Sequence, residues 1–292
     1  RAGHGESAYP LLRLCLLVEV GTRRVLDAVC APFDVGEPTL ARNLLGALPA
    51  CSLLLLDAGY FGGPFVQTFE ALGSERAFLL ALPSNARPRV LKRLGPGDDL
   101  VEFRLGWRTR QRHPDAAPTW IARVIRYHAR GWRPRFFATN LLAPASAPRA
   151  ELGALYRERW EIELGLADAK GRLLEREEAL RSRTPLLCEQ EAYALLLATN
   201  VLRALGAAHA HAAGVAPRRV SFVALRDLVA FAWSSGLERV AWLLPPRREG
   251  RRSPREVKLG RGPYAPKRLR RSAPERWMWE QSLGRERPKE AA

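Results

Sequence analysis

Short apolar runs, broken by glycine, proline and charged residues, mark strand-length segments in the first 82 residues. The runs Leu11–Val20 and Thr22–Val29, joined around Gly21, predict an antiparallel pair of strands. Ser52–Leu56 and Ala77–Ala81 are continuous apolar runs of the length found in strands that are buried on both faces. The pattern therefore predicts a hairpin followed by two buried strands.

Two stretches with helical spacing alternate with these strands, at residues 39–48 and 65–72. Pro49 closes the first stretch, and Pro64 suits the first turn of the second. The order strand, strand, helix, strand, helix, strand predicts an α/β fold. It is the order of a ribonuclease-H-like core whose first strand is missing.

Residues 83–147 interrupt this alternation and are rich in proline, glycine and arginine. Runs at 100–105, 120–128 and 135–141 predict a small antiparallel, β-rich insertion. Arginine alternates with aromatic residues here, which suits a surface that follows a phosphate backbone. An ordinary basic sheet surface is the alternative. The residues in question are Arg104, Trp107, Arg108, Arg110, Arg126, Trp132, Arg133 and Arg135.

The most distinctive stretch is a helix predicted over residues 156–170, with the sequence YRERWEIELGLADAK. At about 100° and 1.5 Å per residue, four polar residues share a stripe about 60° wide and about 21 Å long. They are Tyr156, Arg159, Glu163 and Lys170. An apolar seam beside the stripe predicts how the helix is held against a core, and it comprises Leu155, Ile162, Leu166 and Leu173.

The simplest interpretation of the charges on this helix is a solvated face with i,i+4 ion pairs. Arg157, Glu158, Glu161 and Asp168 fit that interpretation. The four-residue stripe is more specific, because it combines four chemical types at fixed spacing.

A second candidate position is Asp57, which follows the buried run 52–56 and precedes Gly59. Open α/β sheets bind their ligands at the carboxyl ends of the strands, so an acidic residue there is a functional candidate. A strand-ending aspartate in an ordinary turn is the alternative.

The C-terminal part begins with a linker at 181–185 and continues with helices predicted over Glu189–Leu205 and Phe222–Trp233, the second capped by Ser221. The tail, residues 245–292, holds 15 Lys and Arg residues against 6 Asp and Glu residues. Such a tail is poorly able to fold alone, and its charge suits contact with DNA. A solubilising tail is the alternative.

The formal net charge of the chain is +17, which favours a polyanionic partner, either nucleic acid or an anionic membrane. No apolar run reaches the roughly 20 residues that span a bilayer. We therefore expect nucleic acid, and not a membrane, as the partner. The four cysteines lack metal-ligand spacing, which is typical of reduced, mostly buried residues in a cytosolic protein.

Taken together, these features resemble the DDE transposases of the insertion-sequence-four family. The helix matches the family signature Y-x2-R-x3-E-x6-K at Tyr156, Arg159, Glu163 and Lys170. The segment Asp57-x-Gly-Tyr60, the β-rich insertion, the segment 184–233 and the basic segment 254–268 are also similar to the family and follow in the family order.

The resemblance implies a ribonuclease-H-like core in which three carboxylates bind two Mg²⁺ (or Mn²⁺) ions for DNA cleavage and strand transfer. Asp57 matches the second carboxylate and Glu163 the third, as catalytic and metal-binding residues. Tyr156, Arg159 and Lys170 would bind the phosphates or the hairpin end of the transposon DNA.

The first family aspartate lacks a match, because it would lie upstream of Arg1, and Glu19 and Asp27 fit ordinary strand charges. The resemblance thus implies the C-terminal part of a transposase, impaired in catalysis. Its expected organisation is a first part of the core (1–82), the insertion (83–147), a second part of the core with the signature helix and C-terminal helices (148–244), and the basic tail (245–292).

Two other functions stay open. One is a DNA-binding protein without catalysis, and the other is an RNA-processing nuclease of the same broad fold, which the signature helix disfavours. A transposase would be cytoplasmic and associated with the nucleoid, and a homodimer on DNA is a further expectation.

Overall fold

The computed structural model describes residues 12–128, 134–173, 180–182 and 184–235. These residues belong to one of the two compact units into which the chain divides. The second unit, residues 131–133 and 246–292, lies outside the described residues, and so does nearly all of the basic tail predicted at 245–292.

The predicted antiparallel pair is present as β1 (Leu12–Val18) and β2 (Val25–Pro32), which form a two-stranded sheet. Leu12 lies opposite Pro32 and Cys15 opposite Val29, with a register shift after Leu17. The connecting turn places Arg23 at a φ of 60°, an unusual conformation for a residue with a side chain. Arg23 is therefore held at the tip of the hairpin.

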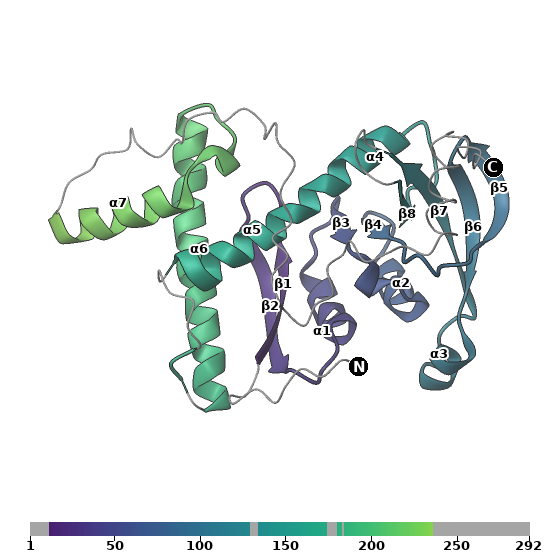
Figure 1. The fold of residues 1–292 in the computed structure, drawn as a ribbon, viewed down its shortest axis with the longest axis horizontal. Coiled ribbons are helices and arrows are strands. Elements are labelled where there is room, and N and C mark those ends of the chain that lie inside the picture. Colours follow the sequence, from purple (N-terminus) through teal and green to yellow (C-terminus); the bar gives the residue numbers. More distant parts are fainter. Residues whose placement is uncertain (1–11, 129–133, 174–179, 183, 236–292) are drawn as a thin grey trace, which may run out of the picture. The chain divides into compact units, whose positions relative to one another are not determined.

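A second sheet contains six strands in the order β3-β4-β8-β7-β6-β5 (Figure 1). The strands β3 (Leu53–Leu56) and β4 (Ala77–Ala81) are parallel, and all other neighbours are antiparallel. The sheet is thus mixed, and the predicted α/β class is confirmed. The remaining strands are β5 (Arg89–Gly95), β6 (Asp98–Arg104), β7 (Thr119–Tyr127) and β8 (Arg135–Thr139).

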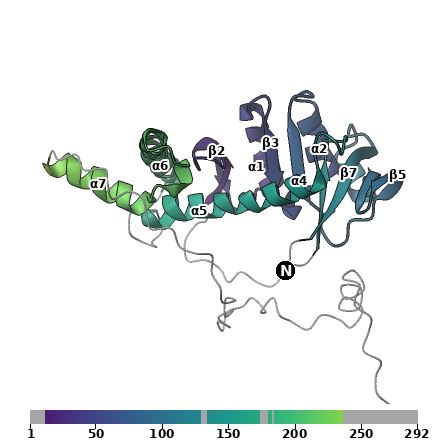
Figure 2. The ribbon, with the colours of Figure 1, turned by 90° about the horizontal axis from the view of Figure 1, so that it is seen from above.

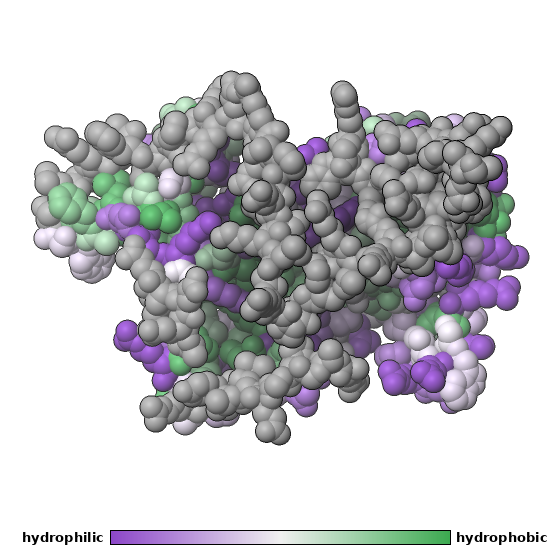
Figure 3. Space-filling model, viewed as in Figure 1, coloured by the Kyte–Doolittle hydropathy of each residue, from purple (hydrophilic) through white to green (hydrophobic). Residues whose placement is uncertain are grey.

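The strands predicted as an insertion extend the sheet of β3 and β4, because β8 pairs directly with β4 at Leu79–Ala81. The sequence pattern missed β5, whose first five residues are all exposed and show no burial periodicity. It also missed the short helix α3 (Trp107–Arg112), which carries three arginines. The surface at the place of α3 is largely hydrophilic (Figure 3).

Among the described residues, β1 and β3 each have a single strand neighbour and do not pair with each other. Each therefore has one free edge. The sequence predicted that a strand would be lacking at this place, between the hairpin and the first buried strand.

One hydrophobic core nevertheless joins the hairpin to the six-stranded sheet. It includes Cys15 and Leu17 from β1, Leu80 from β4 and Phe103 from β6. The helices α1 (Glu37–Leu44) and α2 (Gly63–Glu70) complete it. Both helices have a proline in the first turn, where its missing N–H costs nothing.

The opposite face of the sheet is covered by α4 (Arg149–Tyr156). Leu79 and Phe137 contribute to this second core together with Leu152 and Tyr156 from the helix. Leu79 and its neighbour Leu80 belong to different cores, since successive side chains of a strand point to opposite faces.

A long helical segment, residues 149–172, runs without a break in the ribbon and is called the signature helix below (Figures 1 and 2). It consists of α4, a 3₁₀ turn η3 (Arg157–Trp160), α5 (Glu161–Ala167) and a π turn η4 (Asp168–Arg172). It passes from β7 to the last helices of the described chain.

The predicted apolar seam of this helix is wrong at Leu155, which is 42% exposed. The helix instead buries the adjacent face, with Leu152, Gly153 and Tyr156. The physical reason is a close approach to β7: a Cβ on Gly153 would lie 2.0 Å from Cδ2 of Tyr127. The face that contains the glycine therefore faces the sheet.

The C-terminal helices are α6 (Pro185–Ala212) and α7 (Phe222–Ser235), joined through a 3₁₀ turn η5 (Pro217–Arg219). Helix α6 is longer than predicted at both ends. It is fixed to β2 by Asn200, whose side chain accepts from the Val25 N–H and donates to the Val25 carbonyl, both at 2.8 Å.

The predicted cap of α7 is present, because Oγ of Ser221 accepts from the N–H of Ala224 at 3.3 Å. Helix α7 exposes hydrophobic residues, among them Phe231 and Trp233. Hydrophobic atoms are visible at the left of Figure 3, where Figure 1 places α7. In the described part of the chain, no helix combines the length and the apolar character needed to span a bilayer.

Candidate active site

Asp57 lies directly after β3 and begins the 3₁₀ turn η2 (Ala58–Tyr60). Its Oδ1 accepts a hydrogen bond from the N–H of Gly59 at 2.8 Å. A Cβ at Gly59 would lie only 3.0 Å from that oxygen, which accounts for glycine at this position. The turn thus holds an exposed carboxylate at the carboxyl end of a strand, as the sequence predicted.

Tyr156 connects the signature helix to this strand end. Its side chain is 5% exposed and its ring centroid lies 4.3 Å from that of Phe137. The hydroxyl donates to the carbonyl oxygen of Leu56 at 3.0 Å. Burial raises the pKa of the Tyr156 hydroxyl, the nearby Arg159 lowers it and Asp57 raises it further. The hydroxyl is therefore within electrostatic reach of both side chains.

Arg159 and Glu163 continue the row of contacts along the helix. Nη2 of Arg159 lies 3.0 Å from Oε1 of Glu163, and a hydrogen bond with Arg159 also lowers the pKa of Tyr156. The side chain of Glu163 is 43% exposed, so solvent and ligands can reach it. Tyr156 is thus bound to the end of β3, and Arg159, within electrostatic reach of Tyr156, pairs with Glu163.

Lys170 lies further along the same helix, in the π turn, with an exposed side chain. Seven residues separate it from Glu163, which corresponds to about 10 Å along a helix axis. The structure therefore places Tyr156 at the end of β3. Glu163 and Lys170 follow at intervals of seven residues, about 10 Å each, along the helix.

Asp57 and Glu163 offer the oxygen ligands that Mg²⁺ and Mn²⁺ prefer, and both reach solvent. Magnesium commonly binds through one or two carboxylates and keeps several waters, so the chemistry of these two side chains suits such an ion. Within the described ranges there is no group of three or more His, Cys, Asp or Glu residues that could hold a metal. A carboxylate separation of about 4–8 Å, suited to metals about 4 Å apart, stays a prediction.

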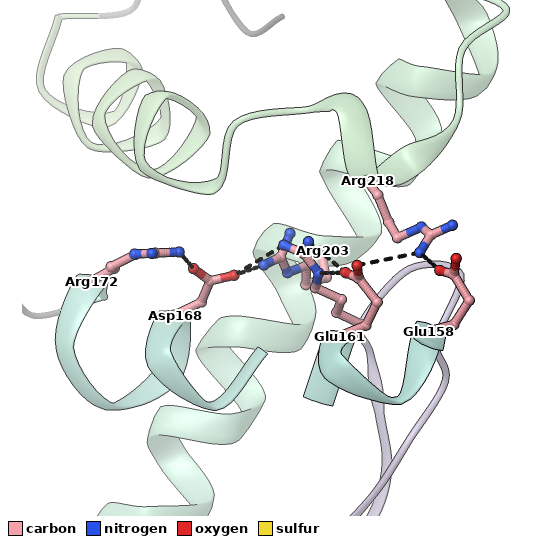
Figure 4. A network of polar contacts seen from close by, with 7 residues as sticks. Glu158, Glu161, Asp168, Arg172, Arg203 and Arg218 are labelled. Atoms are coloured by element: carbon pink, nitrogen blue, oxygen red, sulfur yellow. Dashed lines mark hydrogen bonds and ion pairs between the residues drawn. The ribbon is translucent and has the colours of Figure 1, made fainter. Parts of the chain in front are cut away.

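The opposite side of the signature helix carries acidic residues that the sequence pattern assigned to a solvated face. That assignment is wrong for Asp168, which is fully buried. Oδ1 of Asp168 lies 2.6 Å from Nη1 of Arg172, and Oδ2 contacts Nη2 of Arg203 and lies 3.8 Å from Nη1 of Arg23 (Figure 4). Its arginine partners in the hairpin and in α6 are distant in the sequence, so no local spacing revealed them.

Two further acidic residues extend this network. Glu161 lies 2.6 Å from Arg23 and 3.4 Å from Arg218, and Glu158 contacts Arg218 (Figure 4). The network therefore links the signature helix to the hairpin tip, to α6 and to η5.

A separate buried ion pair supports the start of the signature helix. Arg123 on β7 is fully buried and donates to both carboxylate oxygens of Asp98, at 2.7 and 2.6 Å. Its Nη1 also donates to the carbonyls of Leu141 and Ala147, at 3.1 and 2.7 Å. Arg123 thus fixes the segment that leads from β8 into α4.

Fold and site define the class: an α/β protein with one acidic residue at a strand end and a second on a helix bound to that strand. A family model described as "Transposase DDE domain" matches residues 1–201. The chain belongs to this family.

The chain is 29% identical over 215 residues to "Transposase InsG for insertion sequence element IS4" of Escherichia coli strain K12. The match covers 73% of this chain and 48% of that protein, so the chain spans about half the length of this relative. A solved structure, "Cryo-EM structure of piggyBac transposase synaptic complex with hairpin DNA (SNHP)", aligns with a TM-score of 0.45 at 10% identity, over 77% of this chain and 46% of that one.

Proposed function

We propose that this chain carries the catalytic core of a DNA transposase, which acts in metal-dependent DNA cleavage and strand transfer. Asp57 and Glu163 are its metal-binding catalytic carboxylates. One observation carries the proposal: Tyr156 of the signature helix donates to the carbonyl of Leu56, the residue before Asp57. The helix that carries Glu163 is therefore bound to the strand end that carries Asp57, as a metal site shared by these two elements would require.

A bound Mg²⁺ or Mn²⁺ ion would supply the activation of a water, and then of a 3′-hydroxyl, for attack on a phosphodiester. The chain's own residues prepare for this chemistry. The η2 turn holds one oxygen of Asp57 by the Gly59 N–H, which restricts the orientation of the carboxylate. Arg159 pairs with Glu163 at 3.0 Å, which restricts the position of that carboxylate on the helix.

DNA is the proposed partner, and the exposed side chain of Lys170 and the partly exposed one of Arg159 are suited to phosphate contacts. Arginine can grip a phosphate with two parallel hydrogen bonds, whereas lysine acts as a point charge. Tyr156 as a DNA contact stays a prediction, and contact through its hydroxyl would require release of the bond to Leu56. Assembly as a homodimer on DNA and association with the nucleoid belong to the same proposal.

A second candidate is DNA binding without catalysis, in which Asp57 and Glu163 bind no metal. It is favoured by the carboxylate count, because only two of the three family carboxylates have a match here and the described residues hold no cluster of three. We therefore expect weak nicking activity from this chain. The net charge of +17 supports DNA binding in both cases.

Binding of Mn²⁺ tests the proposal. Titration of the chain with Mn²⁺, followed by electron paramagnetic resonance, should show a site that Asp57→Asn and Glu163→Gln each weaken. The variant Glu102→Gln, which removes an acidic residue far from the site in sequence and on β6, serves as the control. Equal Mn²⁺ binding by all four proteins would exclude the metal site and leave the non-catalytic function.

Nicking of supercoiled DNA with Mg²⁺ or Mn²⁺ is the complementary assay. Activity should rise when an Asp-bearing strand is added before residue 1, and Glu163→Gln should abolish it. Strong nicking by the 292 residues alone, lost in Glu163→Gln, would instead place the remaining carboxylate within these residues.

A further inference from the structure

The signature helix has a second polar face, roughly opposite the one that carries Glu163. At about 100° per residue, Glu161 lies about 160° and Asp168 about 140° from Glu163 around the helix axis. The acidic residues of this second face pair with arginines of the same chain. Figure 4 shows this for Glu158, Glu161 and Asp168. The helix is thus held on one face and carries the candidate site on the other.

Asp168 is the most deeply buried member of the second face. It is fully buried and contacts Arg172 on its own helix, Arg203 on α6 and Arg23 at the hairpin tip. Three positively charged side chains surround this one carboxylate, and removal of its charge would leave them uncompensated. A fully buried carboxylate therefore connects three parts of the chain that are separated in sequence.

Arg203 is also nearly enclosed, at 6% exposure, and its guanidinium lies 4.6 Å from the ring centroid of Phe222 at the start of α7. Burial and the charge of Arg23 lower the pKa of Arg203, to about 10. It therefore stays charged at neutral pH, and Asp168 is the carboxylate in contact with it.

Asp168 also begins the π turn of the helix. The N–H of Leu173 donates to the carbonyl of Asp168 at 2.9 Å, an i to i+5 bond. Such turns shift the angular positions of the residues that follow, and they are frequent at functional sites. Lys170 lies inside this turn, so its direction depends on where the turn begins.

We propose that Asp168 is a positioning residue: by binding Arg203 and Arg23, it sets the rotation of the signature helix, so that Glu163 stays on the opposite, exposed face and Lys170 follows on the same side as Glu163. The inference rests on the proposed function for the role of Glu163. A helix without this contact would turn about its axis, because Arg23 and Arg203 would then repel each other across its buried face.

The test compares Asp168→Asn with the wild-type chain in two measurements, Mn²⁺ affinity by electron paramagnetic resonance and amide hydrogen exchange over residues 156–167. We expect Mn²⁺ affinity to fall about tenfold or more, as for other residues that orient a metal ligand, and exchange to become faster. Replacement of both members of the pair, in Asp168→Asn with Arg203→Met, should restore part of the affinity, since it removes the uncompensated charge.

Two controls separate positioning from general effects. Glu151→Gln removes an exposed acidic residue from the same helix, and Phe69→Leu destabilises the main core without touching the helix. Both should keep wild-type Mn²⁺ affinity under conditions in which they are folded. If Phe69→Leu lowers the affinity as much as Asp168→Asn does, the effect is loss of stability and the inference fails.

The outcomes also distinguish this inference from the proposed function. Mn²⁺ binding that depends on Glu163 in the wild-type chain but is unchanged in Asp168→Asn would overturn the positioning role alone. Absence of Glu163-dependent binding in the wild-type chain would overturn the proposed function, and hydrogen exchange over 156–167 would then decide whether Asp168 positions the helix.

Discussion

At the scale of single residues, Tyr156 is the most informative. Its ring belongs to the core beneath the sheet, while its hydroxyl reaches the last carbonyl of β3 beside Asp57. Tyr156, which the family signature associates with DNA, therefore also connects the signature helix to β3. Its two roles can be separated by removal of the oxygen alone.

Tyr156→Phe should lower the free energy of unfolding by about 0.5–1.5 kcal/mol, because the buried Leu56 carbonyl loses its donor while the ring stays in place. Urea denaturation followed by circular dichroism measures the change. Tyr193→Phe is the matched control, because that hydroxyl also donates to a carbonyl, of Ala28 at 3.1 Å, but on an exposed side chain. A loss in the control equal to that in Tyr156→Phe would contradict the role of burial.

The comparison of wild type with Tyr156→Phe also gives a prediction about pH. Burial raises the pKa of Tyr156 in the folded state, so above about pH 10 the unfolded chain releases this proton first. The folded state then binds more protons, and stability falls as pH rises. The advantage of wild type over Tyr156→Phe should therefore be constant below pH 9 and shrink above pH 10 in urea titrations. If the stability difference between wild type and Tyr156→Phe instead grows with pH, the prediction is wrong.

At the scale of helices and strands, the sequence predicted those elements that a run of apolar residues or a capping residue marks. The strands β3 and β4 and the hairpin have such runs, and Ser221 caps α7. Strand β5 was missed because its first five residues are exposed. Its pairing with β6, two residues further along the chain, therefore leaves no apolar pattern in its own sequence.

The residues of the candidate site also divide into those that the local sequence reveals and those that it does not. Asp57 and Glu163 could be singled out from their places at a strand end and in a spaced motif. Asp168 could not, because its burial depends on Arg23 and Arg203, which are brought to it by the hairpin and by α6. Its spacing on the helix fits a solvated charge as well as it fits a buried one.

The close contact between α4 and β7 allows a prediction at this scale. Gly153→Ala should lower the free energy of unfolding by about 1–3 kcal/mol, because the new methyl group would overlap the ring of Tyr127. Gly46→Ala is the control, since a Cβ at Gly46 meets no atom within 4 Å. Thermal melts of both variants measure the difference, and equal melting temperatures would show that α4 can move away from β7 without cost.

At the scale of the whole molecule, charge is the dominant property. The formal net charge is +17, and residues 245–292 hold 15 of the 47 Lys and Arg residues. Within the described residues, by contrast, several arginines neutralise carboxylates of the protein itself, among them Arg123 and Arg203. The number of arginines alone therefore overstates how many of them are available to DNA in the folded unit.

Deletion of residues 245–292 should flatten the dependence of DNA affinity on salt. Each phosphate contact contributes about 0.9 to the slope of log affinity against log salt concentration, so the loss of several contacts is measurable. Fluorescence anisotropy with a short duplex at several salt concentrations gives both slopes. The same slope for both proteins would show that the tail makes no phosphate contacts.

Among the residues that the structure describes, β1 and β3 each have an edge without a strand neighbour, which bears on how the chain behaves in concentrated solution. An edge strand exposes a row of backbone donors and acceptors on which another chain can form a new strand. The β3 sequence, Leu53–Leu56, contains no charged residue or proline of the kind that blocks such pairing. Backbone hydrogen bonds form between neutral groups, so added salt would screen the repulsion between these cationic molecules and leave that attraction intact. High-salt buffers, chosen to strip nucleic acid from the protein, would therefore promote its self-association.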